Sequence, residues 1–208
     1  ILAPLAGIPV LGGTLDCFLN TDLVDQIILV INPHDEAEIS NIIQRVDSGK
    51  VMLAYGGQDR QDSVFNGIKC VNETASVVLV HDAARPFINK SILKRSIDFA
   101  NRYGAACAGM PAKDTIKLVD ENGVILDTPD RSKVWMAQTP QSFKAEVIKH
   151  AYEEANKSGI RATDDASLAE AQGYKVYMFE GSYNNIKITS AEDLVFAEQL
   201  IAQSDLMQ

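Results

Sequence analysis

The sequence is short of three things: long hydrophobic runs, cysteine and histidine, and positive charge. Its longest apolar stretches, such as IILVI and SVVLV, are far shorter than the roughly 18 residues of a membrane-spanning helix. Nineteen Lys and Arg stand against 28 Asp and Glu, so the formal net charge is −9 over 208 residues. Sequence-independent binding to nucleic acid requires basic side chains to neutralise phosphates, which this balance opposes. We therefore expect no nucleic acid and no membrane as partner, whereas a small anionic ligand needs only locally gathered positive charge.

Reactive and metal-binding side chains are also scarce. The sequence holds three cysteines and three histidines: Cys17, Cys70, Cys107, His34, His81 and His150. The cysteines are odd in number, far apart and set in apolar stretches, so we interpret them as buried side chains in a reducing compartment and expect a cytoplasmic protein. Metal ligation or a disulfide is the alternative. The histidines lack metal-ligand spacing, and no Ser-His-Asp or Cys-His arrangement stands out, which favours positioning and electrostatics over covalent catalysis.

Strand-like and helix-like segments alternate along most of the chain. Residues 1–3 read as the end of a buried strand, and the continuous apolar run at 26–32 suits a strand buried on both faces. Apolar side chains at helical spacing follow at 35–46. Further strands are expected at 50–54, 76–82 and 104–111, and further helices at 60–71 and 90–103. This alternation predicts one α/β domain over residues 1–208, built on a doubly wound, mostly parallel sheet.

The alternation is interrupted at about 114–132, where two short extended pieces surround Asn122-Gly123. Asn-Gly is a strong hairpin signal, and apolar residues alternate with polar ones beside it. We interpret this segment as a β-arm that projects from the sheet. The alternation then resumes, with strands expected at 133–139, 175–181 and 185–189 and helices at 144–159, 164–173 and 190–203.

Chemically dense segments follow two of the predicted strands. In doubly wound sheets, ligands bind outside the carboxyl ends of the strands. Gly56 and Gly57 permit a close backbone approach to a ligand ahead of a helix with free N–H groups, although taken alone they are better explained by a tight strand-to-helix turn. Asp82 and Arg85 follow the next strand, where a carboxylate serves a metal-bound phosphate or a sugar hydroxyl and Arg holds phosphate oxygens. A plain Asp82–Arg85 pair that fixes the loop is the alternative.

Three further polar positions have both a functional and a structural interpretation. Arg131 lies before a predicted strand and Thr139 after it, and Arg131 alternatively pairs with a neighbouring surface acid. Lys187 lies between Ile186 and Ile188 in a predicted strand. There it is either a ligand-binding group or the solvent-facing member of an alternation.

Taken in order, a set of segments resembles the 2-C-methyl-D-erythritol 4-phosphate cytidylyltransferases: GGQDRQDS, HDAARPF, KDTIK, DRSKVWMAQTPQSF, TDDAS and NNIKIT. TPQSF and NIKIT are shared with the related ribitol-5-phosphate cytidylyltransferases, whereas HDAARPF together with TDDAS favours the methylerythritol family. The resemblance implies a Rossmann-like nucleotidyltransferase of the non-mevalonate isoprenoid pathway. It would join CTP and 2-C-methyl-D-erythritol 4-phosphate to give 4-diphosphocytidyl-2-C-methyl-D-erythritol and pyrophosphate. The alternatives are ribitol 5-phosphate as the acceptor or a non-catalytic nucleotide-binding relative.

The resemblance also implies roles for individual residues. Positions that match the family's cytidine-nucleotide site are Ala3, Gly57, Gln58, Ser63, Asp82 and Ala83. Positions that match its acceptor site are Arg85, Thr115, Arg131, Thr139 and Lys187, with Lys187 and Arg131 the expected catalytic residues. Gln58 stands where the family often has an acid, so its role is open. Mg²⁺ is expected to be held mainly through the CTP phosphates, with no protein ligand. The arm is expected to reach into the site of a second subunit and to make the enzyme a homodimer.

The start of the chain departs from the family pattern. The family begins with a strand and an Ala-Gly-rich loop that carries an Arg and a Lys, whereas here ILA meets PLAGIPVL directly. We expect that loop to belong between Ala3 and Pro4. A relative that truly lacks the loop would have lost the charges that stabilise the transferring phosphoryl group.

Overall fold

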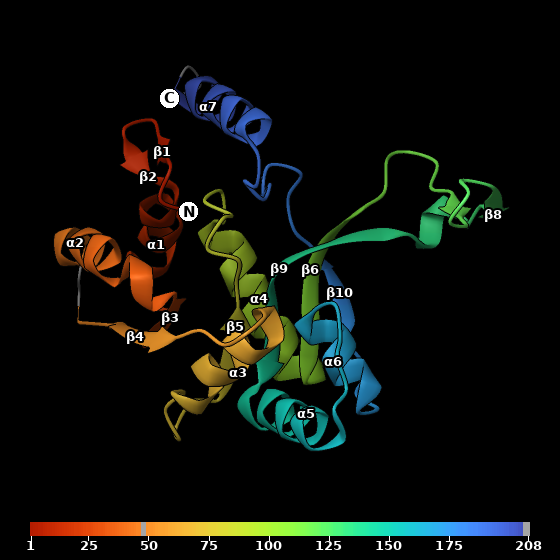
Figure 1. Cartoon of the computed structure of the whole chain (residues 1–208), viewed down its shortest axis with the longest axis horizontal. Helices are drawn as coiled ribbons and strands as arrows, with labels where there is room; N and C mark the ends of the chain where they lie inside the picture. The colour runs from red at the N-terminus through yellow and green to blue at the C-terminus, as the bar shows by residue number, and fades with distance from the viewer. Residues whose placement is uncertain (47–48, 206–208) are drawn as a thin grey trace.

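The structure, a computed structural model, describes residues 1–46 and 49–205 and has the expected α/β architecture (Figure 1). Two sheets form its body, a four-stranded sheet of order β10-β6-β9-β5 and a two-stranded sheet of β3 and β4. The strands of these sheets are β3 Ile27–Ile31, β4 Val51–Tyr55, β5 Val77–Val80, β6 Ala105–Pro111, β9 Trp135–Lys144 and β10 Tyr177–Glu180.

The four-stranded sheet is mixed, which corrects the expectation of a mostly parallel sheet. β10 runs parallel to β6, whereas β9 runs antiparallel to both β6 and β5. The cause is the arm: the chain leaves β6 at Pro111 and returns at Trp135, and because these two residues are paired, β9 must run back along β6. β3 and β4 are parallel, and no pairing among the described residues joins them to the other sheet. A single doubly wound sheet therefore stays a prediction.

Helices cover these sheets near the places that the sequence predicts. They are α1 Val10–Leu19, α2 Glu36–Val46, α3 Arg60–Lys69, α4 Lys90–Tyr103, α5 Ala145–Ser158, α6 Asp165–Ala171 and α7 Ala191–Asp205. The side chains of Asp59, Asn89 and Asp164 each accept a hydrogen bond from the amide three residues later. Each of these caps satisfies an amide that the first turn of the helix leaves unpaired.

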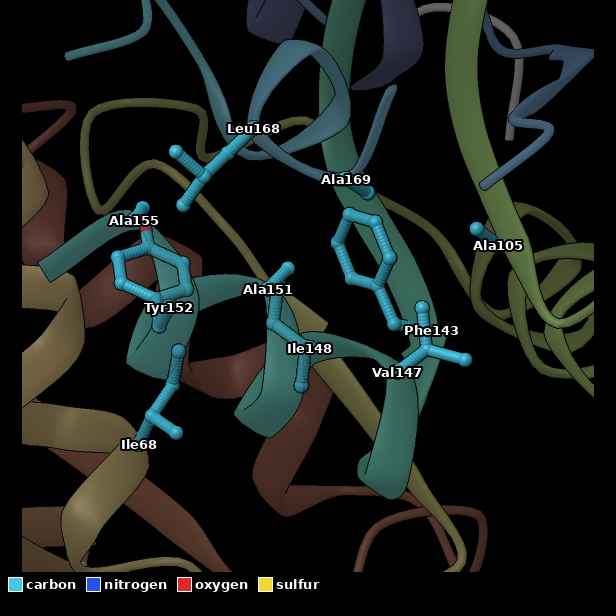
Figure 2. Packing of buried hydrophobic residues seen from close by; sticks show 10 residues of the cluster. All are labelled: Ile68, Ala105, Phe143, Val147, Ile148, Ala151, Tyr152, Ala155, Leu168 and Ala169. Atoms are coloured by element: carbon cyan, nitrogen blue, oxygen red, sulfur yellow. The ribbon is translucent and has the colours of Figure 1, made fainter. Parts of the chain in front are cut away.

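Apolar side chains at helical spacing form the core between these layers. Figure 2 shows one cluster, in which Phe143 of β9 and Ile148 and Tyr152 of α5 lie near Leu168 of α6. Ile148 and Tyr152 are four residues apart, so they occupy the same face of α5. A second cluster packs α1 and α2 on β3. These clusters fix the strand ends and helix starts from which the candidate site is built.

The N-terminal residues form a tight hairpin. Residues 1–3 are not a strand, contrary to expectation, and β1 Pro4–Leu5 pairs with β2 Ile8–Pro9. Ala6 and Gly7 turn the chain with φ of 50° and 86°, as a two-residue turn with both φ values positive requires. The carbonyl oxygen of Ala3 then accepts a hydrogen bond from the Val10 amide at 3.0 Å. The loop expected between Ala3 and Pro4 stays a prediction that this hairpin does not test.

The expected β-arm is a hairpin that projects from the body (Figure 1). β7 Leu118–Val119 pairs antiparallel with β8 Ile125–Asp127, and a short 3-10 helix at Arg131–Lys133 leads into β9. Five apolar side chains near its tip are exposed: Leu118, Val119, Val124, Ile125 and Leu126. A two-stranded hairpin with exposed apolar side chains has little stability of its own in water.

The segment that contains Lys187 is extended but is not a strand, which corrects the prediction for 185–189. Ile186 and Ile188 pack in the cluster of Leu5 and Val10, so they alternate with Lys187 as the sequence suggests. The Ile188 amide donates at 2.8 Å to the Ala84 carbonyl oxygen rather than to a neighbouring strand. This contact places Lys187 beside the loop after β5.

Candidate active site

One large cavity runs along β3 and β5, where residues 23–33 and 74–83 line it, and it extends to the loop after β4. It has a volume of about 1230 Å³, and five of the six residues expected to bind the nucleotide line it: Gly57, Gln58, Ser63, Asp82 and Ala83. Ala3 is not among the lining residues and is exposed beside the N-terminal hairpin. The fold therefore brings together two loops that lie 25 positions apart in the sequence, as ligand binding at strand ends requires.

The loop after β4 is shaped for a close backbone approach. The Gly57 amide donates to Ser63 Oγ at 3.0 Å, and Ser63 Oγ donates to the Asp59 carbonyl oxygen at 2.7 Å. A Cβ atom at position 57 would lie 2.4 Å from Asp62 Cβ, so only glycine fits there. Gln58 is exposed between Gly57 and the helix cap. The turn is thus a tight strand-to-helix connection, and it also exposes backbone to the cavity.

Asp82 joins two cations at the end of β5. Its Oδ2 accepts from Arg85 Nε at 3.2 Å and lies 3.3 Å from Lys187 Nζ. Burial raises the pKa of this carboxyl, but the positive charges of Lys187 and Arg85 together lower it by a larger amount. Its pKa therefore lies below the ordinary value. Only 16% of the Asp82 side chain is exposed, against 44% for Lys187. The Asp82–Arg85 pair considered from the sequence is therefore present, and the partly exposed side chain of Lys187 also contacts Asp82.

Asn185 fastens the Lys187 segment to the same loop. Its carbonyl oxygen accepts from Arg85 Nη1 at 2.8 Å, and its side-chain Nδ2 donates to the Thr139 carbonyl oxygen at 2.8 Å. Asn185 is fully buried, so these contacts are made away from water. Asn185 carries no local signal in the sequence, because it lies directly before apolar residues and its partners are 46 and 100 positions away.

His81 and Thr139 form the wall behind Asp82. Thr139 Oγ1 accepts from the Asp82 amide at 3.0 Å and contacts His81 Nδ1 at 3.0 Å, while His81 Nε2 contacts the Arg85 carbonyl oxygen at 3.2 Å. Burial against Phe18 and the strand ends lowers the pKa of His81 to about 4, despite the hydrogen bond to Arg85 and the charge of Asp82. His81 has no expected role in the sequence, although its place before Asp82 is a usable signal.

The two arm residues lie apart from this cluster within one chain. Thr115 and Arg131 are exposed on the arm, which projects away from the body (Figure 1). Arg131 Nη1 donates to the Lys113 carbonyl oxygen at 2.9 Å, so it does not form the expected alternative pair with a neighbouring acid. The remaining acceptor-site residues, Arg85, Thr139 and Lys187, belong to the body.

The described residues contain no group of three or more His, Cys, Asp or Glu side chains arranged to hold a metal ion. Within the same residues, no helix is both long and apolar enough to cross a membrane. The three cysteines are free.

Comparison with known proteins decides the family. The model of the 2-C-methyl-D-erythritol 4-phosphate cytidylyltransferase family matches residues 1–203. The chain belongs to this family. A cytidylyltransferase of that name from Clostridium botulinum (strain Loch Maree / Type A3) is 45% identical over 195 residues, which cover 93% of this chain and 85% of the relative. Another from Clostridium acetobutylicum is 42% identical over 207 residues, which cover 97% of this chain and 89% of the relative.

Solved cytidylyltransferase structures agree with the fold. The 4-diphosphocytidyl-2C-methyl-D-erythritol synthase from Anaerococcus prevotii superposes with a TM-score of 0.90 at 35% identity, over 96% of this chain and 88% of that one. The 2-C-methyl-D-erythritol 4-phosphate cytidylyltransferase from Thermus thermophilus gives 0.82 at 30% identity, over 97% and 93% of the two chains. This cytidylyltransferase chain is thus a nucleotidyltransferase of α/β fold.

Proposed function

We propose that CTP binds where the loops after β4 and β5 line the cavity, and that the cytidylyl group is transferred there to 2-C-methyl-D-erythritol 4-phosphate. An oxygen of the acceptor phosphate attacks the α-phosphorus of CTP, the bond to the β-phosphate oxygen breaks, and pyrophosphate leaves with that electron pair. The attacking phosphate is already anionic, so the reaction needs no strong general base. The observation that carries the proposal is the convergence of Gly57, Ser63, Asp82 and Ala83 on one cavity in a chain of this family.

In this mechanism the protein supplies position and charge rather than a nucleophile. Lys187 is exposed enough to turn from Asp82 to a phosphate oxygen, where it stabilises the charge that develops in transfer. Arg85 is held by both Asp82 and the Asn185 carbonyl, so it contributes a fixed positive charge beside the acceptor phosphate. A net charge of −9 is compatible with this role, because these cations concentrate the positive potential at one place.

Mg²⁺ fits this site as a companion of CTP. Mg²⁺ keeps several waters and usually binds substrate phosphates rather than a protein cage, and the described residues supply no such cage. When bound, the ion neutralises triphosphate charge and so favours departure of pyrophosphate. Gly57 and Ser63 orient the nucleotide that brings it, without acting as ligands.

We propose that the arm makes a homodimer and completes the acceptor site of the partner. The exposed apolar side chains of Leu118, Ile125 and Leu126 support this, because they have no cover within the described chain. Arg131 and Thr115 lie on the arm, which projects away from the body that carries Lys187 (Figure 1). A second copy of the chain would therefore supply the arm at each site. A protein that sediments as a monomer at all concentrations would contradict the dimer, and Leu126→Asp should dissociate it.

A further segment of polypeptide, which carries the Gly-rich loop, is proposed to complete the sheet. The cavity is lined continuously by residues 25–31 on the β3 side and 76–82 on the β5 side. β3 pairs with β4 and β5 pairs with β9, while α1 and α3 also line the cavity. Backbone N–H and C=O groups on covered strand edges need partners, and one extended strand between β3 and β5 satisfies both edges. Such a strand would merge the two sheets into the doubly wound sheet that the sequence predicts.

The gene tests this directly. Codons between those of Ala3 and Pro4 should encode a segment that includes a loop with an Arg and a Lys. Amide exchange along 27–31 and 77–80 should be slower in the chain that contains the segment than in the chain of 208 residues. A gene without such codons would support the non-catalytic relative instead.

Cytoplasmic location is proposed as well. Its support is the three free cysteines, which a reducing compartment maintains.

Pyrophosphate release tests the activity. With CTP, Mg²⁺ and 2-C-methyl-D-erythritol 4-phosphate the protein should release pyrophosphate, and with ribitol 5-phosphate it should release far less. The family match supports this order of acceptors. Faster release with ribitol 5-phosphate would preserve the chemistry but change the substrate, whereas no release with either acceptor by the gene-length protein would contradict the function.

A further inference from the structure

The imidazole ring of His81 belongs to a hydrogen-bond network with three other polar groups: the Arg85 carbonyl, the Thr139 hydroxyl and the Asp82 amide. Its Nε2 faces the Arg85 carbonyl oxygen at 3.2 Å, and its Nδ1 faces Thr139 Oγ1 at 3.0 Å. Thr139 Oγ1 also accepts a hydrogen bond from the Asp82 amide at 3.0 Å. His81 and Asp82 are adjacent in the chain, so these contacts close a small ring of interactions around the start of the loop after β5.

The direction of each hydrogen bond follows from the chemistry of the groups. A backbone carbonyl oxygen only accepts, so Nε2 must carry the hydrogen. A neutral imidazole has one N–H, so Nδ1 is an acceptor and the Thr139 hydroxyl must donate to it. The Thr139 hydroxyl oxygen then accepts a hydrogen bond from the Asp82 amide. Every group in the network is satisfied in the neutral Nε2–H tautomer, whereas the Nδ1–H tautomer leaves the contact between Nε2 and the Arg85 carbonyl oxygen without a hydrogen.

The network holds the loop that carries the proposed chemistry. The Arg85 amide donates to the Asp82 carbonyl oxygen at 3.0 Å, so residues 82–85 form a turn that His81 fastens at both ends. Asp82 in turn holds Arg85 Nε and Lys187 Nζ. Thr139 is only 4% exposed, and its hydroxyl hydrogen is committed to His81. Thr139 therefore acts on the site through Asp82 rather than as a donor to a phosphate.

We propose that His81, as the neutral Nε2–H tautomer, is a positioning residue that sets the Asp82–Arg85 turn through Thr139 and through the Arg85 carbonyl. The proposal relies on the proposed role of Asp82 and Lys187 in cytidylyl transfer. It assigns to Thr139 a positioning role where the family resemblance suggests contact with substrate.

A spectroscopic experiment tests the tautomer independently of activity. Long-range ¹H–¹⁵N correlation spectra of ¹⁵N-histidine-labelled protein distinguish the two neutral tautomers and the charged ring, and His81→Gln identifies the signal. We expect an Nε2–H ring for His81 at pH 7. Thr139→Val should shift the Nδ1 signal and leave the exposed His34 unchanged. An Nδ1–H ring or a charged ring at pH 7 would overturn the proposal whether or not the protein turns over CTP.

Two substitutions of His81, each of which retains one of its two contacts, separate the kinetic effects of those contacts. Gln at position 81 places its amide near Nε2 and retains a donor to Arg85, whereas Asn places its amide oxygen near Nδ1 and retains an acceptor for Thr139. His81→Gln and Thr139→Val should each lower kcat/KM for CTP about tenfold, the size of one positioned hydrogen bond. The double variant His81→Gln/Thr139→Val should lose no more than the worse single variant, because both break the same contact. His81→Asn combined with Thr139→Val should lose more than either alone.

The control is His150→Asn, since His150 makes an exposed contact with Tyr174, neither residue lines the cavity, and the change should leave kcat/KM unaltered. Multiplied losses of about a hundredfold in the His81→Gln/Thr139→Val variant would show that the two residues act independently and would overturn the proposal. Lower melting temperatures with unchanged kcat and KM would reduce His81 to a structural role and also overturn it. Wild-type protein that neither binds nor turns over CTP would instead contradict the proposed function, and the tautomer spectrum would still decide the inference.

Discussion

The body and the arm of this molecule hold their polar residues in opposite ways. In the body, Asp82 pairs with both Arg85 and Lys187, and Arg85 also donates to the Asn185 carbonyl oxygen. On the arm, Arg131 is exposed and touches only a backbone carbonyl among the contacts that the structure describes. The polar side chains of the body are therefore held in place by one another. Arg131 on the arm would act on a ligand only when another surface lies beside it. Changes in the body should affect the chemistry or the fold, and changes on the arm should affect acceptor binding and assembly.

The largest expected effect comes from the body. Lys187→Ala should lower turnover on the order of a hundredfold, or about 3 kcal/mol, because it removes a positioned donor to developing charge. Steady-state pyrophosphate release measures it. Lys94→Ala is the matched control, since Lys94 pairs with Asp98 on the exposed face of α4 and should have normal turnover. Near-normal turnover of a folded Lys187→Ala protein would remove Lys187 from the mechanism.

A second body effect concerns stability and pH. His81 has a pKa of about 4 in the folded protein against an ordinary value of 6.5, so the unfolded chain takes up the proton first. The contribution of neutral His81 is complete above about pH 6.5 and is lost as pH falls toward 4, by at most about 3 kcal/mol. Asp82, with its lowered pKa, adds a further loss only at still lower pH. Urea unfolding at pH 7.5 and pH 4.5 measures the change.

The comparison between wild type and His81→Gln isolates the histidine in that experiment. The wild-type protein should lose more stability on acidification than the variant does. Equal losses in both proteins would show that His81 does not remain neutral in the fold.

The smallest effect belongs to the arm. Arg131→Ala should raise KM for the acceptor about tenfold and leave KM for CTP near normal, since its proposed contact is to the acceptor phosphate. The melting temperature should hardly change, because Arg131 is exposed. Initial rates at varied acceptor and fixed CTP measure this split. An equal rise in both KM values would mean that Arg131 supports the whole site rather than the acceptor.

Much of the fold follows from local sequence. The apolar run that became β3 packs on α1 and α2 through its buried residues Leu29 and Ile31, although its other residues are only half-buried, and Asn122-Gly123 correctly marked the arm. The antiparallel course of β9 was not predictable, because it depends on where the arm returns to β6. Lys187 was wrongly placed in a strand, since alternation arises from packing of Ile186 and Ile188 even without a hydrogen-bonded neighbour.

The candidate site likewise contains some residues that the sequence identifies and others that it does not. Asp82 and Gly57 were found because they follow strands and belong to recognisable segments. His81 was missed, because its function depends on Thr139, 58 positions away in the sequence, and on the direction of hydrogen bonds that only the fold fixes. Asn185 was missed for the same reason. Contacts between distant loops are set by topology, so local patterns identify the groups that bind and not the groups that position them.

Mixing two disabled chains tests most directly whether body and arm of different subunits share a site. Lys187→Ala has an intact arm, and Arg131→Ala has an intact body. In a mixed dimer, the body of the Arg131→Ala chain meets the arm of the Lys187→Ala chain, and that one site is complete. At low acceptor concentration, mixed and re-equilibrated chains should therefore release pyrophosphate faster than the sum of the separate variants. A rate equal to that sum, with mixed dimers demonstrated by native mass spectrometry, would contradict the shared site and place the arm's role within its own chain.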